Sequence, residues 1–259
     1  MPTLEFPVNV ILASQSPRRQ QLLKDAGVKF AVYTSPTPVD ESLDDDLRAN
    51  PEEAVKKLAE RKAGAAVQEI LAQNPEGLGV IIGADTAVVL DGKMYGKPYS
   101  ADHARQMLAE LSGRTHAVIT GVSVWLMFLA PSANASEDGN VSIGFRTFSE
   151  TSYVTFKELT TADINAYVAT GETIDKAGAY GIQGKGAALV ERYEGSYNNI
   201  VGLPVETLLE QFPDILRETV EMEVTEVTTE ENAEEPDTAK ADAEDTENSA
   251  EDASGETQN

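Results

Sequence analysis

Residues 11–23 read ILASQSPRRQQLL and mark a change from one type of secondary structure to another. An apolar run, VNVILAS at residues 8–14, overlaps the beginning of this stretch and predicts a buried strand. Ser16 and Pro17 are typical of an N-cap and a first helical residue. Leu22, Leu23 and Ala26 then follow helical spacing. A strand that passes directly into a helix is the opening unit of an α/β fold.

Arg18 and Arg19 stand side by side at the start of this predicted helix. The dipole and the free N–H groups of a helix N-terminus disfavour cations and attract anions. A bound polyphosphate would compensate both guanidiniums, and the hydroxyls of Ser14 and Ser16 would add donors. The alternative is that the arginines pair with nearby acids on the protein surface. The spacing alone leaves both interpretations open.

The composition excludes several kinds of site. The 259 residues include no cysteine and two histidines, so thiolate zinc sites, cysteine nucleophiles and multi-histidine metal sites are excluded. A metal would need oxygen ligands, which favours magnesium or manganese. The surplus of 44 acidic over 20 basic residues argues against a general nucleic-acid binder. We find no signal peptide or membrane-spanning run and expect a cytoplasmic protein.

Acidic residues gather at the end of the chain, where residues 221–259 hold fifteen of them and one lysine. This segment has no aromatic residue and too few large aliphatic ones to offset the entropy of ordering. We therefore predict a folded domain over residues 1–218 and a disordered acidic tail over 219–259. Along the domain, strand and helix patterns alternate and a strand meander follows, which predicts an α/β fold with a mixed sheet.

Asp85 interrupts the apolar segment LGVIIGADTAVVL. A carboxylate is costly to bury unless it is paired or near a metal. It could be a turn residue between two strands, with Gly83 marking the turn. The functional alternative is an active-site carboxylate at the end of a strand, acting as a base or a metal ligand.

Further candidates come from lysines, acids and a glycine-rich segment. Lys62 lies on an apolar helix face and Lys97 follows a turn, although each taken alone is typical of an exposed lysine. Glu41 could help to hold a cation. The segment DKAGAYGIQGKGAAL lets backbone approach a ligand closely, and the amide of Gln183 could read a base edge. An incidental glutamine in a set of tight turns is the alternative.

Together the segments LASQSPRRQQLL, GADTAVVLDGKMYGKP, LSGRTH and DKAGAYGIQGKG…EGSYNNIVGLPVE resemble the Maf (septum-formation protein) family of nucleoside triphosphate pyrophosphatases. The resemblance extends from about residue 10 to 209. It implies a fold related to the inosine triphosphate pyrophosphatases, with a long mixed sheet and two lobes around a cleft. The sequence DKAGAYGIQG resembles the branch that acts on dTTP and UTP.

The resemblance also implies roles for particular residues. Asp85 falls on the position of the proton acceptor, and Arg18, Thr86 and Gln183 fall where the family sets base preference. The positions of substrate or metal contact are matched by Ser14, Arg19, Glu41, Lys62 and Lys97. A divalent cation, Mg²⁺ or Mn²⁺, would be held by Asp85 and Glu41.

The expected reaction is hydrolysis of dTTP and UTP, and of modified pyrimidine nucleotides, at the α–β bond to give the monophosphate and pyrophosphate. The family also suggests a homodimer. One alternative is a nucleotide-binding regulator of cell division with little turnover, and another is a phosphatase that releases orthophosphate. A base such as Asp85 together with Lys62 and Lys97 favours the enzyme, because a pure binder needs no base.

Overall fold

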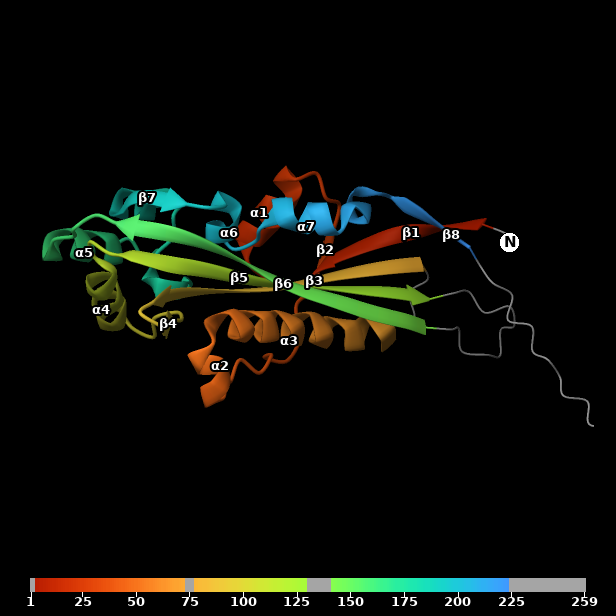
Figure 1. Cartoon of the computed structure of the whole chain (residues 1–259), viewed down its shortest axis with the longest axis horizontal. Helices are drawn as coiled ribbons and strands as arrows, with labels where there is room; N and C mark the ends of the chain where they lie inside the picture. The colour runs from red at the N-terminus through yellow and green to blue at the C-terminus, as the bar shows by residue number, and fades with distance from the viewer. Residues whose placement is uncertain (1–2, 73–76, 130–140, 224–259) are drawn as a thin grey trace, which may run out of the picture. The chain divides into compact units, whose positions relative to one another are not determined.

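A mixed sheet of eight strands organises the chain in this computed structural model, which describes residues 3–72, 77–129 and 141–223 (Figure 1). The strands are β1 (Thr3–Leu12), β2 (Ala31–Val32), β3 (Gly77–Leu90), β4 (Lys93–Tyr95), β5 (Thr115–Leu129), β6 (Val141–Phe156), β7 (Val190–Glu194) and β8 (Thr219–Glu223). Their order is β2-β1-β3-β5-β6-β7, with β4 paired to β3 and β8 to β1. Strand β1 runs parallel to β2 and β3, and the other pairs are antiparallel. The predicted α/β fold with a mixed sheet is confirmed.

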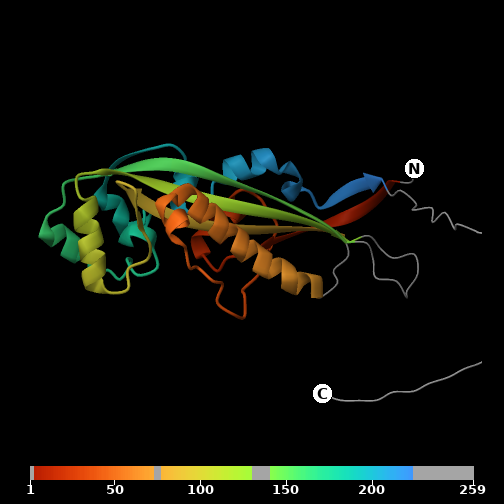
Figure 2. The same cartoon turned by 60° about the horizontal axis from the view of Figure 1, so that its bottom comes forward.

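Helices cover both faces of this sheet. They are α1 (Pro17–Asp25), α2 (Asp45–Ala49), α3 (Pro51–Ala72), α4 (Ala101–Leu111), α5 (Thr161–Val168), α6 (Tyr197–Val201) and α7 (Val205–Gln211), with 3₁₀ turns η1 (Ala177–Ala179), η2 (Gly184–Leu189) and η3 (Pro213–Leu216). Helix α3 runs along one face, and α1, α6 and α7 lie on the opposite face (Figures 1 and 2). Helices α4 and α5 pack together at one end of the sheet.

Each face of the sheet has its own hydrophobic core. The larger core joins α1, α4, α5, α6 and α7 to the even-numbered residues of β3, such as Val80 and Ile82. The smaller clusters join α3 to the odd-numbered residues, such as Ile81 and Ala87. Because side chains alternate along a strand, consecutive residues of β3 serve different cores.

Two glycines let α3 approach the sheet closely. A Cβ atom added to Gly83 of β3 would lie 2.4 Å from the carbonyl oxygen of Ala59, and one added to Gly121 of β5 would lie 2.5 Å from that of Val55. These distances are shorter than any Cβ contact allows, so only glycine fits. The close packing brings Lys62 of α3 next to β3.

One edge of β3 is left without a partner strand between residues 83 and 87. Strand β1 pairs with β3 as far as Ile82, and β4 pairs with it from Val88. On its other edge, β3 stays paired with β5 along this whole stretch. In open α/β sheets, ligands bind beyond the carboxyl ends of strands where the topology changes. The gap therefore places Asp85 and Thr86 where a ligand can reach them.

The structure refines several expectations. Asp85 lies within one continuous strand, β3, so it is neither a turn residue nor at the end of a strand. Gly83 does not mark a turn; it lets α3 pack closely against the sheet. The segment ADINAYVAT predicts a helix capped by Thr161, and the structure has Thr160 as the N-cap of this helix, α5. The segment KFAVYTS predicts a strand over residues 29–35, of which β2 covers Ala31–Val32.

The predicted boundary at residue 218 falls too early. Residues 219–223 form β8, antiparallel to β1, and Val220 is buried. Apolar residues alternate with acids here, and that pattern matches a strand with one solvated face. The segment APSANASEDGN at 130–140 is polar and small, which predicts a hairpin loop. Both this segment and residues 224–259 of the expected tail lie outside the described residues.

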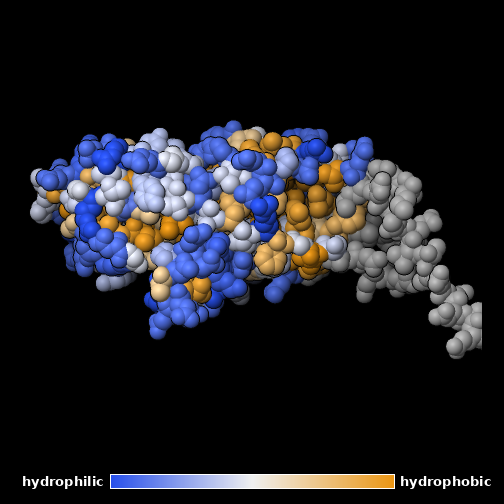
Figure 3. Space-filling model, in the orientation of Figure 1, coloured by the Kyte–Doolittle hydropathy of each residue, from blue (hydrophilic) through white to orange (hydrophobic). Residues whose placement is uncertain are grey.

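The described surface differs between the two ends of the sheet. Figure 3 shows hydrophilic residues over α4 and α5 and more hydrophobic surface where β1 and β3 begin. On β6, in the part that β7 does not pair with, the ring of Phe145 is half exposed and stacks on Trp125 with centroids 4.5 Å apart. Within the described ranges, no helix has the length and apolar character needed to cross a membrane.

Candidate active site

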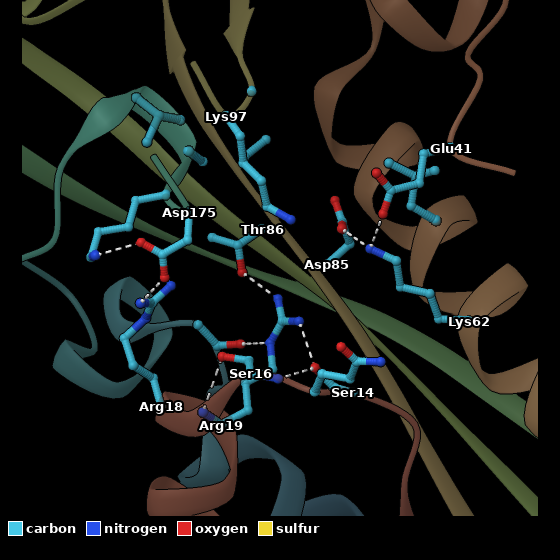
Figure 4. A pocket seen from close by; sticks show the side chains of 18 of the residues that line it. Ser14, Ser16, Arg18, Arg19, Glu41, Lys62, Asp85, Thr86, Lys97 and Asp175 are labelled. Atoms are coloured by element: carbon cyan, nitrogen blue, oxygen red, sulfur yellow. Dashed lines mark hydrogen bonds and ion pairs between the residues drawn. The ribbon is translucent and has the colours of Figure 1, made fainter. Parts of the chain in front are cut away.

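A cleft with a cavity volume of about 1060 Å³ opens at the gap beside β3 (Figure 4). The β1–α1 connection, α3, the loop before α2, the β4–α4 connection and residues 175–183 line it, with Arg18 and Asp175 across the cleft from Glu41 and Lys62. All of the residues predicted from the sequence line this cleft: Ser14, Arg18, Arg19, Glu41, Lys62, Asp85, Thr86, Lys97 and Gln183. The two-sided cleft agrees with the expected architecture.

The cleft reverses the charge balance of the protein. Seven basic residues line it against three acidic ones, whereas the whole chain has 20 basic and 44 acidic residues. The basic residues are Arg18, Arg19, Arg48, Lys62, Lys93, Lys97 and Lys176. A cationic cleft in an acidic protein attracts a polyanion and not a cationic ligand.

The beginning of α1 forms one wall of the cleft. Ser16 is the N-cap, its hydroxyl accepts from the backbone N–H of Arg19 at 3.5 Å, and Pro17 is the first helical residue, as predicted. Ser14 Oγ accepts from the backbone N–H of Ser16 at 3.3 Å and so retains its own hydrogen to donate. This wall therefore offers hydroxyl donors next to a helix N-terminus, where anions are favoured.

The side chain of Arg19 donates hydrogen bonds to three uncharged acceptors. Its Nε donates to the carbonyl oxygen of Gly202 at 2.7 Å, Nη1 to Ser14 Oγ at 3.2 Å and Nη2 to Thr86 Oγ1 at 3.0 Å (Figure 4). Burial lowers its pKa from the ordinary value, Asp85 opposes that effect, and Arg18 adds to it. None of the three acceptors is a carboxylate, so no directly bonded anion offsets the positive charge that the guanidinium presents to the cleft.

A buried chain of hydrogen bonds continues from Arg19 into the protein. Thr86 Oγ1 lies 3.0 Å from Thr120 Oγ1, and Thr120 Oγ1 donates to the carbonyl oxygen of Asn199 at 3.0 Å. Because the hydrogen of Thr120 is used on Asn199, the hydroxyl of Thr86 must donate to Thr120. Asn199 Nδ2 donates to Val118 O and Ser152 Oγ at 3.1 and 2.9 Å. Thr86 therefore has a single orientation.

Asp85 lies on the opposite face of β3 and is paired with Lys62. The ammonium of Lys62 is 2.5 Å from Asp85 Oδ1 and 2.8 Å from Glu41 Oε1. The side chains of Lys62 and Asp85 are 18% and 17% exposed, so both are partly shielded yet reach the cleft. Partial burial raises the pKa of Glu41, but the hydrogen bond and charge of Lys62, with Lys97 and Arg19, outweigh that effect and lower it overall.

Lys97 and Gln183 complete the predicted set as exposed residues. Lys97 points toward the space between Thr86 and Asp85 (Figure 4), and its charge contributes to the lowered pKa of Glu41. Gln183 follows the buried Ile182 at the start of η2. An exposed ammonium and an exposed amide in a cleft are both available to a ligand.

Asp175 is a cleft residue that the sequence reasoning did not single out. Its Oδ2 accepts from Arg18 Nη1 at 3.0 Å, and its Oδ1 accepts from Lys176 Nζ at 2.7 Å. Asp175 lies inside the segment DKAGAYGIQG, so the signal was present in the sequence, but its partner Arg18 is 157 residues away. Of the two open interpretations of the arginines, pairing with an acid holds for Arg18 alone.

A divalent cation fits the two carboxylates at Lys62. Asp85 and Glu41 both approach the same ammonium nitrogen, so their oxygens already converge on one positive charge. In the part of the chain that the structure describes, no three His, Cys, Asp or Glu residues cluster as a metal site. Mg²⁺ is commonly held by one or two carboxylates, with water and substrate phosphates as the other ligands. The donor set therefore suits a cation that arrives with phosphate.

Taken together, these observations describe an α/β protein with a cleft rich in basic residues at a gap in its sheet. The sequence profile described as Maf-like protein matches residues 9–215. The chain belongs to the Maf family.

Its relatives include three proteins named dTTP/UTP pyrophosphatase. The one from Bacillus velezensis is 46% identical over 196 residues, which cover 76% of this chain and 90% of the relative. Those from Desulfitobacterium hafniense and Alkalilimnicola ehrlichii are 43% and 41% identical, covering 78% and 80% of this chain and 83% and 95% of the relatives. The profile match over residues 9–215 includes every predicted site residue.

Proposed function

We propose that this protein is a nucleoside triphosphate diphosphatase that hydrolyses dTTP and UTP at the α–β bond, with modified pyrimidine nucleotides as further candidate substrates. One observation carries the proposal: the half-buried Asp85 borders a cleft lined by seven basic residues. A polyphosphate would be attracted by the basic residues and would meet a carboxylate base at the gap in the sheet. The names of the three relatives support this choice of reaction and substrate.

In the proposed reaction, Asp85 accepts a proton from a water molecule whose oxygen attacks the α-phosphorus. The bond between the α-phosphorus and the oxygen that bridges to the β-phosphorus breaks, and pyrophosphate leaves with that oxygen. Lys62, Lys97 and Arg19 stabilise the negative charge that grows on the leaving group. Positioning and electrostatics supply most of the acceleration in such transfers.

Arg19 and Lys62 hold different parts of this arrangement. Arg19 is tied to Ser14, Thr86 and Gly202, so it fixes the wall against which the phosphates bind. Lys62 orients Asp85 and can exchange that contact for a phosphate oxygen. Mg²⁺ or Mn²⁺ held by Asp85 and Glu41 would neutralise phosphate charge as a Lewis acid.

The test is a nucleotide panel with Mg²⁺ or Mn²⁺, scored separately for monophosphate, pyrophosphate and orthophosphate. We expect dTTP and UTP to give monophosphate and pyrophosphate. Asp85→Asn should bind nucleotide and turn over at least about a hundredfold more slowly, because the base is lost. Asp25→Asn, which changes an exposed aspartate of α1, is the matched control.

Three outcomes would contradict the proposal. Release of orthophosphate alone would indicate a phosphatase. Tight nucleotide binding without turnover in the wild-type protein would favour the regulator. Near-normal turnover in Asp85→Asn would remove Asp85 from the role of base.

The remaining expectations are also proposals. We propose a cytoplasmic location, because nucleoside triphosphates are intracellular metabolites, and no nucleic-acid partner, because the chain is strongly acidic. The homodimer rests on the family resemblance and is tested by the mass of the protein in sedimentation equilibrium.

A further inference from the structure

The two adjacent arginines have different electrostatic surroundings. Arg18 donates to the carboxylate of Asp175 at 3.0 Å, whereas the side chain of Arg19 donates to a carbonyl and two hydroxyls. The carboxylate of Asp175, which also accepts from Lys176, offsets part of the charge that Arg18 presents to the cleft, and the neutral acceptors leave that of Arg19 intact. A phosphate is therefore attracted to Arg19, and Arg18 is left with donors suited to an uncharged acceptor.

The side chain of Asp175 is itself held in place. Lys176 Nζ donates to Asp175 Oδ1 at 2.7 Å and to the carbonyl oxygen of Glu172 at 2.5 Å. The side chain of Lys176 is 14% exposed, in contrast to 61% for Asp175. An ordinary surface ion pair contributes little because its side chains move freely. Here one partner is anchored, so the carboxylate has a defined position.

Lys176 also supports the turn that carries Gln183. A Cβ added to Gly181 would lie 2.9 Å from Cε of Lys176, so the lysine stem packs directly against this turn. The backbone N–H of Gly181 donates to the hydroxyl of Tyr167 at 3.2 Å. A Cβ added to Gly186 would lie 2.0 Å from the carbonyl oxygen of Gly181, which closes the turn from the other side. Asp175 and Lys176 thus connect Arg18 to the turn before Gln183.

We propose that Asp175, anchored by Lys176, is a positioning residue that commits Arg18 to the base of the nucleotide instead of its phosphates. The inference rests on the proposed function and names the substrate class more closely. Uracil and thymine present acceptor, donor and acceptor along their pairing edge, and cytosine presents a donor at one end. Arg18 only donates, and the amide of Gln183 both donates and accepts. Arg18 and Gln183 together suit a 4-oxo pyrimidine, and the donors of Arg18 disfavour the amino group of cytosine.

The test compares UTP with CTP in Asp175→Asn, which keeps the shape of the side chain and removes its charge. We expect the ratio of kcat/KM for UTP over CTP to fall about tenfold, because an amide oxygen accepts from Arg18 more weakly than the carboxylate does and directs the guanidinium less firmly. The kcat for UTP should stay within about threefold of the wild type, because the groups at the α-phosphorus are unchanged. Inhibition by inorganic tripolyphosphate should strengthen, since a carboxylate no longer offsets part of the charge of Arg18.

Two further variants make the test specific. Asp214→Asn removes the same kind of carboxylate from an exposed pair with Arg217 on η3, outside the cleft, and should change none of these values. In an Arg18→Gln background, Asp175→Asn should have no further effect on the UTP to CTP ratio, because it acts through Arg18.

An unchanged ratio together with unchanged tripolyphosphate inhibition would overturn the inference while leaving the proposed function intact. If Asp175→Asn lowered kcat/KM equally for UTP and CTP, the inference would also be overturned. The same conclusion would follow if Asp175→Asn changed the UTP to CTP ratio as much in the Arg18→Gln background as in the wild type. If the wild-type protein hydrolyses no nucleotide, the proposed function fails. The affinities for UTP, CTP and tripolyphosphate, measured by calorimetry in wild type and Asp175→Asn, would then test the role of Asp175 separately from turnover.

Discussion

Asp85 and Thr86 are neighbours in the chain and point to opposite faces of β3, where their surroundings differ. On the α3 face, Asp85 shares Lys62 with Glu41 in a group of three charged side chains. On the other face, Thr86 belongs to a chain of neutral hydroxyl, amide and carbonyl groups that ends in the fully buried Thr120 and Asn199. We therefore expect the face with Asp85 to carry the proposed chemistry, whereas the hydroxyl of Thr86 on the other face accepts from Arg19 and helps to hold it in place.

The largest effect is expected from Lys62→Met. This variant leaves Asp85 and Glu41 close together without a cation, and it removes a charge from the phosphate site. We expect turnover to fall about a hundredfold or more, because preorganised charges supply a large share of catalysis. Steady-state kinetics on UTP measures it.

Lys57→Met changes an exposed lysine of the same helix, paired with Glu60, and serves as the control. Turnover of Lys62→Met close to that of Lys57→Met would show that the charged face does not carry the chemistry.

Gly83→Ala tests the packing that brings α3 to this face. The new Cβ would lie 2.4 Å from the carbonyl oxygen of Ala59, so the helix must shift away from the sheet. We expect a loss of about 1–3 kcal/mol in the free energy of unfolding, as for other overpacked sites, and reduced turnover because Lys62 moves from Asp85. Urea denaturation and kinetics measure the two effects.

Gly144→Ala on β6, where nothing lies within 4 Å of the added Cβ, should be tolerated. If Gly83→Ala were as stable and active as Gly144→Ala, the close packing would not position the site.

Thr120→Val tests the neutral face. The change keeps the shape of the side chain but leaves the carbonyl oxygen of Asn199 without its donor and the hydroxyl of Thr86 without its acceptor. We expect a loss of about 1–3 kcal/mol in the free energy of unfolding. Because Arg19 is held through Thr86, KM for UTP should rise while kcat changes less.

Thr120→Ser restores the hydroxyl and should recover most of both values. A rise in KM that persists in Thr120→Ser would assign the effect to packing and not to the hydrogen bond.

The smallest effect at neutral pH is expected from replacing His116, which is buried on the same face of the sheet as Thr120. Its Nε2 lies 2.7 Å from the hydroxyl of Tyr180, and burial lowers its pKa to about 4, against a weaker opposing effect from the backbone of Arg114. The unfolded chain binds the proton more readily, so this histidine stabilises the fold fully above its ordinary pKa of about 6.5. That contribution, up to about 3 kcal/mol, is lost as the pH falls toward 4.

Urea denaturation between pH 4 and 8 measures this contribution. His116→Gln should show a shallower loss of stability on acidification than the wild-type protein. Parallel curves for the two proteins would show that His116 does not titrate on unfolding.

The sequence predicted the start of α1 and the unusual place of Asp85 because their signals are local, whereas the full set of candidate site residues depended on the resemblance to the Maf family. Ser16 and Pro17 mark a helix start by themselves, and Asp85 stands out in an apolar strand. The features that the sequence did not predict depend on contacts between residues far apart in the chain. The gap beside β3 follows from where β1 and β4 stop pairing, and the division between Arg18 and Arg19 depends on Asp175 and Gly202. The roles of the cleft residues remain predictions that the experiments above test.

The alternation along β3 has a consequence for how this site can change. Since successive side chains point to opposite sides, deleting or inserting one residue between Gly83 and Asp85 would exchange the environments of the carboxylate and the hydroxyl. The acid would then enter a neutral, fully enclosed hydrogen-bond chain, and the threonine would face Lys62. Point substitutions can tune such a site gradually, but a change of length in this strand would disable catalysis and folding in a single step.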